Sequence, residues 1–128
     1  MNLLEEIAYH LEYEGFGEVS TTERVGKIFW GLMPDSPDYC ICVFSTDSAY
    51  PGSSNAGRFQ IVVRAKSVTL AYETACEITD ALAEFNDFLH GDGAKAIIEV
   101  VNSAVSLGED EKKRQLYSSN YTIRYCDY

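Results

Sequence analysis

The sequence changes from a strand pattern to a helix pattern within residues 58–89, and this stretch constrains the fold most strongly. In its first half, apolar residues alternate with polar ones and would share one face: Phe59, Ile61, Val63 and Ala65. In its second half, apolar residues recur at spacings of four and three: Ala71, Ala75, Ile78, Leu82 and Phe85. The first period is typical of a half-buried strand and the second of an amphipathic helix. Either Ser67 or Thr69 would cap this helix.

The rest of the chain predicts a further helix and four further strands. An apolar stripe over residues 3–11 predicts the first helix, which Gly15 and Gly17 would end. Aromatic and β-branched residues predict strands at 27–33 and 39–44, joined by a short turn that contains two prolines. Residues 86–93 would close the second helix. The last strands are predicted at 95–101, which can continue past a break to 106, and at 116–125, with a charged turn between them.

These elements favour an α+β fold over a single domain, residues 1–128. We expect a mainly antiparallel sheet of about four to five strands, with the N-terminal helix and a longer central helix packed on it.

The formal charge is −10, with 20 acidic and 10 basic side chains. This balance argues against tight binding of DNA or RNA, because contacts to phosphate need clustered Lys and Arg. The N-terminus lacks a signal-peptide pattern, and no apolar run approaches the ~20 residues of a membrane span. We expect a soluble protein made in a cytoplasm.

No catalytic pattern is found, so neither an enzyme nor a cofactor is expected. Cys40 and Cys42 would share a strand face as small buried hydrophobes, because a zinc site would need a second close pair or two spaced histidines. His10 is expected at the surface or partly packed, and His90 at the end of the central helix.

Carboxylates form a stripe on the face of the central helix opposite its apolar one, and no Lys or Arg lies between Lys66 and Lys95. The stripe consists of Glu73, Glu77, Asp80, Glu84 and Asp87. Like charges at these spacings destabilise a helix by ~0.2–0.5 kcal/mol per pair. Such a stripe is either a solvated face that tolerates this cost, or a face that meets a basic partner or lines an acidic passage.

Basic residues on the outer face of the central strand provide a complementary surface: Arg58, Arg64 and Lys66. Our hypothesis is that this face meets the acidic helix face of an identical copy, head to tail, as in a ring. Residues 45–57, which include Tyr50, form a polar loop that is either a contact arm or a plain hairpin loop.

Three segments resemble the small phage proteins of the minor capsid or tail terminator type: FQIVVRAKSVTLAYETACEITDALAEF, LGEDEKKR and YSSNYTIRY. The resemblance implies an α+β subunit of a ring, typically a hexamer, in the virion at the head-tail junction. Such a ring caps the tail tube and joins it to the head. The implied partners are further copies of the chain, the tail tube protein and a head-completion protein, while DNA passes through the lumen without being bound tightly.

The resemblance places Arg58, Arg64, Lys66 and Tyr50 at subunit contacts, and the carboxylate stripe near the lumen or a partner. Two alternatives stay open. One is a head-completion protein of similar fold, and the other is an acidic inhibitor that mimics DNA with its regularly spaced carboxylates.

Overall fold

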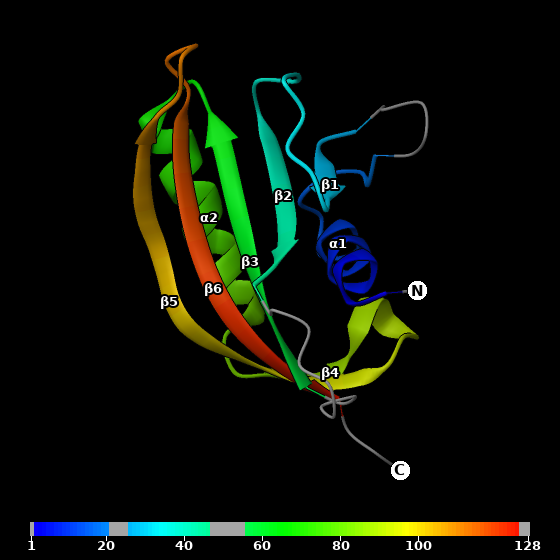
Figure 1. Cartoon of the computed structure of the whole chain (residues 1–128). Coiled ribbons are helices and arrows are strands. Elements are labelled where there is room, and N and C mark those ends of the chain that lie inside the picture. The colour runs from blue at the N-terminus through cyan, green and yellow to red at the C-terminus, as the bar shows by residue number, and fades with distance from the viewer. Residues whose placement is uncertain (1, 21–25, 47–55, 126–128) are drawn as a thin grey trace.

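Figure 1 shows the computed structural model of the chain, which describes residues 2–20, 26–46 and 56–125. The predicted loop at 45–57 falls largely outside these residues, and so does Tyr50. Within the described residues the elements follow the order α1 (Leu3–Tyr13), β1 (Ile28–Trp30), β2 (Cys40–Ser45), β3 (Ala56–Ala65), α2 (Val68–Leu82), β4 (Phe85–Phe88), η1 (Leu89–Gly91, a 3-10 turn), β5 (Lys95–Glu109) and β6 (Gln115–Tyr125). None of the described helices is long and apolar enough to cross a membrane.

The described strands form one sheet of six, in the order β1-β2-β3-β6-β5-β4. This confirms the predicted α+β class, although the sheet is mixed and has more strands than expected. The short turn predicted between the first two strands is wrong, because β1 runs parallel to β2. The intervening residues carry the chain back before β2 begins, so that Ile28 lies beside Ile41 and Trp30 beside Val43.

Both helices pack into one apolar core. The helix α2 lies against β3, β5 and β6, while α1 lies against β1, β2 and η1. The alternation predicted for the central strand is confirmed, since its four apolar residues are all buried: Phe59, Ile61, Val63 and Ala65. Ile7 and Leu11 from α1 and Ile78 and Leu82 from α2 join the same core.

Side-chain caps set the start of each helix. Asn2 accepts a hydrogen bond from the Glu5 backbone N–H at 2.8 Å, and Ser67 accepts one from Leu70 at 3.1 Å. Of the two predicted caps of α2, Ser67 is therefore the one used. Gly15 follows α1 with φ +93°, a left-handed conformation that glycine adopts without strain and that ends the helix as predicted.

The predicted extension of the central helix to residue 89 is wrong. The helix ends at Leu82, Glu84 turns the chain with φ +55°, and Phe85 begins β4. Phe85 pairs with Ile98 and packs against the main core from a strand. It therefore continues the apolar spacing of the helix without being helical, which explains the error.

The strand β5 is longer than predicted and reaches Glu109. It pairs with β6 along its length, but the register shifts at three places: between Val100 and Asn102, between Asn102 and Val105, and between Ser106 and Gly108. On its other side, β4 pairs only with residues 95–98. In Figure 1, the remainder of β5 forms one side of the sheet.

Candidate assembly surface

The face of the sheet away from the main core carries a small second cluster of Phe29, Cys40 and Cys42. The two thiol sulfurs lie 3.7 Å apart on adjacent outward positions of β2, and both residues are fully buried, as predicted. The hydrogen bond to Cys40 and burial together raise the pKa of the Cys42 thiol, which keeps it neutral. No group of metal-ligating side chains large enough to hold an ion occurs in the part of the chain that the structure describes.

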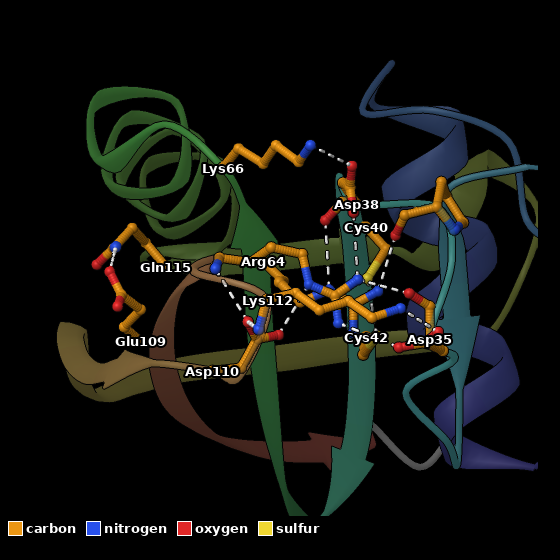
Figure 2. Close-up of polar contacts among 12 residues, drawn as sticks. Asp35, Asp38, Cys40, Cys42, Arg64, Lys66, Glu109, Asp110, Lys112 and Gln115 are labelled. Atoms are coloured by element: carbon orange, nitrogen blue, oxygen red, sulfur yellow. Dashed lines mark hydrogen bonds and ion pairs between the residues drawn. The ribbon is translucent and has the colours of Figure 1, made fainter.

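Arg114 joins the charged turn after β5 to the segment before β2. Its guanidinium is only 4% exposed and donates from Nε to the Asp110 carboxylate at 2.8 Å. One of its terminal nitrogens also donates to the backbone carbonyl of Asp35 and, at 3.3 Å, to the Asp38 carboxylate. The charged turn after β5 is thereby fastened to the segment before β2, as the acidic partners in Figure 2 show. We call Arg114 and these three aspartates the Arg114 network.

All three of these carboxyls have a pKa below the usual value; at Asp38 burial opposes the shift, and the contacts with Lys66 and Arg114 outweigh it. The hydrogen bond from Lys112 holds the pKa of Asp35 below its ordinary value, and the Arg114 backbone N–H does the same for Asp110. The contacts with Lys112 and Arg114 therefore favour the charged form of these carboxyls, which is the form that pairs with Arg114.

The structure gives different surroundings to the basic residues predicted at subunit contacts. Arg64 lies on the outer face of β3 as predicted, but it is buried and donates to the carbonyls of Pro37 and Asp38 at 2.7 and 3.3 Å. Lys66 is exposed and pairs with the Asp38 carboxylate at 3.3 Å (Figure 2). Arg58 is exposed.

The predicted carboxylate stripe is divided by the end of the helix. Glu73, Glu77 and Asp80 lie exposed on α2, opposite its buried residues. Glu84 and Asp87 fall beyond the helix, so their assignment to it is corrected. Asp87 is in β4, where its carboxylate accepts a hydrogen bond from the Phe88 backbone N–H at 2.8 Å.

An exposed apolar surface that the sequence analysis missed runs along β5. Among the described residues, no strand pairs with the outer edge of β5 from 99 to 109. Three large apolar side chains project there, and Val101 and Leu107 are 61% and 54% exposed. The third is Val105. The run of valine and leucine after the predicted break carried the signal, but ending the strand at 101 concealed it.

Further exposed apolar side chains lie on α2, which covers the core face of the sheet. Tyr72 is half exposed and packs edge-to-face on Tyr117, with 5.5 Å between ring centroids, and Tyr117 pairs with Ser106 of β5. One helical turn earlier, Val68 is also half exposed. We call the three exposed side chains on β5 the edge patch: Val101, Val105 and Leu107.

The two histidines meet beneath α1. His10 was predicted at the surface or partly packed, but it is fully buried, and its Nδ1 accepts a hydrogen bond from the His90 backbone N–H at 2.8 Å. His90 lies in η1 and not at the end of α2. Burial lowers the pKa of His10 to about 4, with a further contribution from the nearby charge of His90. His10 is therefore a neutral structural group near neutral pH.

Comparison with known proteins gives the chain its family. The family model of the bacteriophage tail terminator protein matches residues 10–126. One solved structure of similar fold is a component of the virion of a native gene transfer agent particle, with a TM-score of 0.58, 11% identity and coverage of 98% of each chain. Another, known only by a sequence identifier, has a TM-score of 0.58 and 14% identity, and the match covers 98% of this chain and 92% of that one. No curated protein matches.

The family match and the fold place the chain among the structural proteins of phage virions. It belongs to the bacteriophage tail terminator family. The resemblance found in the sequence is thereby confirmed, and the surfaces described above are those of a protein that contacts other virion components.

Proposed function

We propose that this chain forms a ring that terminates the tail tube and joins it to the head. The family match over residues 10–126 is the observation that carries the proposal. In this role the chain acts as one domain and by assembly rather than catalysis. It is made in the host cytoplasm, and its partners are further copies of itself, the tail tube protein and a head-completion protein.

The charge of the chain supports a ring through which DNA passes. At a formal charge of −10, a wall built from this protein repels phosphate, and DNA slides past it without sticking. We place Glu73, Glu77 and Asp80 at the lumen or at a partner face, with Glu84 and Asp87 nearby at the end of the helix. This assignment uses the exposed side of α2, whose carboxylates have no basic residue interleaved with them.

We propose that subunit contacts involve the outer face of β3 and the loop before it. Arg58 and Lys66 are exposed there, and Tyr50 lies in the loop outside the described residues. Arg64 would contribute indirectly, because its guanidinium holds Pro37 and Asp38 in place.

Tube growth in the presence of the purified chain tests the function directly. Tail tube protein is polymerised with and without the chain, and tube lengths and ends are measured by electron microscopy. We expect growth to stop and a ring to sit at one end of each tube. Tubes that grow equally long and bare in both reactions would overturn the proposal.

A further inference from the structure

We infer that Cys40 and Cys42 are a redox-active pair, which hydrogen peroxide joins in a reversible disulfide that disturbs the short strand β1. The inference goes beyond the proposed function, because it concerns a chemical modification of the chain and not its assembly. Both residues lie in β2, on the outer face of the sheet, and both are labelled in Figure 2.

The two thiols lie close together on one strand. Residues two apart in a strand point to the same face, and the Sγ atoms of Cys40 and Cys42 are 3.7 Å apart. A disulfide needs about 2.05 Å between its sulfur atoms and about 4.4–6.8 Å between its Cα atoms. Two steps along a strand span about 6.4–6.8 Å, the long end of that range. A small contraction of β2 therefore suffices to bridge the pair.

The surroundings make the two thiols unequal. The hydrogen bond from Cys42 lowers the pKa of the Cys40 thiol, and the positive charges of Arg64 and Arg114 act in the same direction, against burial. Arg64 lies directly opposite Cys40 in the pairing of β2 with β3. Cys42, whose pKa is raised, keeps its proton. Cys40 is therefore the member of the pair that becomes a thiolate, which is the nucleophilic form.

The reaction with hydrogen peroxide needs only these two side chains. The Cys40 thiolate attacks one peroxide oxygen and breaks the O–O bond, which leaves a sulfenic acid on Cys40 and a hydroxide ion. The sulfur of Cys42 then attacks the sulfenic sulfur, and its proton leaves with the hydroxyl group as water. In sum, two thiols lose two protons and two electrons, and one hydrogen peroxide becomes two molecules of water.

Burial controls the rate of this reaction. Both cysteines are 0% exposed, and Phe29, Met33 and Phe44 pack around them. Hydrogen peroxide is small, and it reaches such a pair through local opening of the structure. The folded chain should therefore react more slowly than the same thiols in the unfolded chain.

The disulfide has a structural consequence in β1. That strand has three residues, and its pairing with β2 places Phe29 opposite Cys42 and Trp30 opposite Val43. A bond between Cys40 and Cys42 contracts β2 at this place. On its other side β2 pairs with β3, which is longer and is also held by β6, so β1 is the neighbour that yields. Trp30 is the only tryptophan of the chain, and its fluorescence therefore reports the change.

Strain makes the bond reversible. A bridge at the long end of the permitted Cα separation stores strain, and strained disulfides are reduced more readily than relaxed structural ones. A thiol such as glutathione should therefore restore both cysteines. In the proposed function the chain meets both conditions, because it is made in a reducing cytoplasm and then leaves the cell in a virion.

The test uses the full chain with Cys76→Ser and Cys126→Ser, so that Cys40 and Cys42 are its only thiols. The protein is treated with hydrogen peroxide, and its tryptic peptides are weighed by mass spectrometry. The peptide of residues 28–58 contains both cysteines, so a disulfide within it removes two hydrogen atoms. Oxidation of Met33 in the same peptide adds an oxygen atom and is told apart by mass.

The matched control carries Cys42→Ala in addition. Circular dichroism confirms that both proteins are folded, and Trp30 fluorescence is recorded for each. We expect the peptide of the first protein to lose two hydrogen atoms, its Trp30 fluorescence to change at the same rate, and glutathione to reverse both. In the control, Cys40 should gain oxygen instead, and the fluorescence should stay unchanged.

The inference fails if the pair stays reduced at a peroxide exposure that oxidises it fully in the urea-unfolded chain. It also fails if Cys40 gains oxygen without forming the bond, if the bond forms but Trp30 fluorescence follows the control, or if glutathione does not reduce the bond. The proposed function is tested separately by tube growth, so failure of either one can be told from failure of the other.

Discussion

At the scale of single residues, Arg114 makes the contacts that join two segments on the outer face of the sheet. It carries a buried charge, and its partners lie both in its own turn and before β2, up to 79 residues away in sequence. Because the buried guanidinium is nearly inaccessible to water, loss of these contacts would leave its charge without partners.

We expect Arg114→Ala to lower the free energy of unfolding by about 1–3 kcal/mol, since the Asp110 carboxylate and the Asp35 carbonyl lose a charged donor. Urea unfolding measures this change. Lys113→Ala, one residue earlier in the same turn, should stay within about 0.5 kcal/mol of the wild type. Equal losses in the two variants would show that the network contributes nothing.

His10 should make stability depend on pH. Its pKa falls from 6.5 to about 4 on folding, so the unfolded chain binds the proton more tightly. The contribution of neutral His10 is present in full above pH 6.5 and is lost as pH falls toward 4, by an amount on the order of 3 kcal/mol. Urea unfolding at several pH values measures the slope.

In His10→Gln, this slope should flatten, whatever the variant does to overall stability. Glu14, His90 and Asp87 lie near the ring, and the variant retains all three. An unchanged slope between pH 6.5 and 4 would show that His10 is not the source of the pH dependence.

At the scale of elements, the buried face of α2 stabilises the helix, whereas the like charges on its exposed face destabilise it. Ser67 caps its start and Ala71, Ala75 and Ile78 are buried, so packing stabilises the helix. Its outer carboxylates repel one another at spacings of three and four. A helix that keeps such a face without interleaved lysine is consistent with selection for a surface property at some cost in stability.

We expect Glu77→Lys to stabilise the protein and impair its function. The new lysine would pair with Glu73 and Asp80, which adds about 0.3–1 kcal/mol in total. The same change places a cation on the face that we assign to the lumen or a partner. Urea unfolding gives the first effect, and the yield of infective particles from a complemented phage gives the second, with Glu111→Lys as control. A stable variant with full yield would show that this face is merely solvated.

The sequence predicted an element correctly where a single hydrophobic period ran along the whole element. In β3 the alternation of Phe59, Ile61 and Val63 identified the inner face correctly, because one side of that strand meets the core along its whole length. It was insufficient for Phe85, whose spacing from Leu82 fits a helix equally well. Only the pairing of Phe85 with Ile98 decides the matter, and that contact is remote in sequence.

The candidate surfaces also differ in whether the sequence predicts them. The carboxylates on α2 could be found from their spacing, since a helix converts spacing into a face. The burial of Arg64 and Arg114 could not be predicted from the sequence, because it depends on the segment before β2, which lies across the outer face of the sheet. The edge patch was missed because bulges break the two-residue period from which strands are read.

At the scale of the whole molecule, the excess of acidic residues sets the relation to DNA. A formal charge of −10 gives a field around each copy that repels DNA, and the proposed ring would multiply it. Such a ring would surround DNA without retaining it.

We expect the wild-type chain to show no measurable affinity for duplex DNA at physiological salt, because its 20 acidic side chains outnumber its 10 basic ones. A variant with Glu73→Lys, Glu77→Lys and Asp80→Lys should bind weakly, and its affinity should fall steeply with salt. Fluorescence anisotropy with a labelled duplex measures both. Wild-type binding with a steep salt slope would contradict the proposed sliding surface.

The position of β6 governs when the protein can form during its synthesis. This strand is the last element of the chain, yet it lies in the sheet between β3 and β5. Until it leaves the ribosome, the strands on either side have no common neighbour, and Arg114, which directly precedes it, has only just been added. The sheet is therefore completed only once β6 has been synthesised. A chain cut short before β6 would leave β3 and β5 without the strand that joins them.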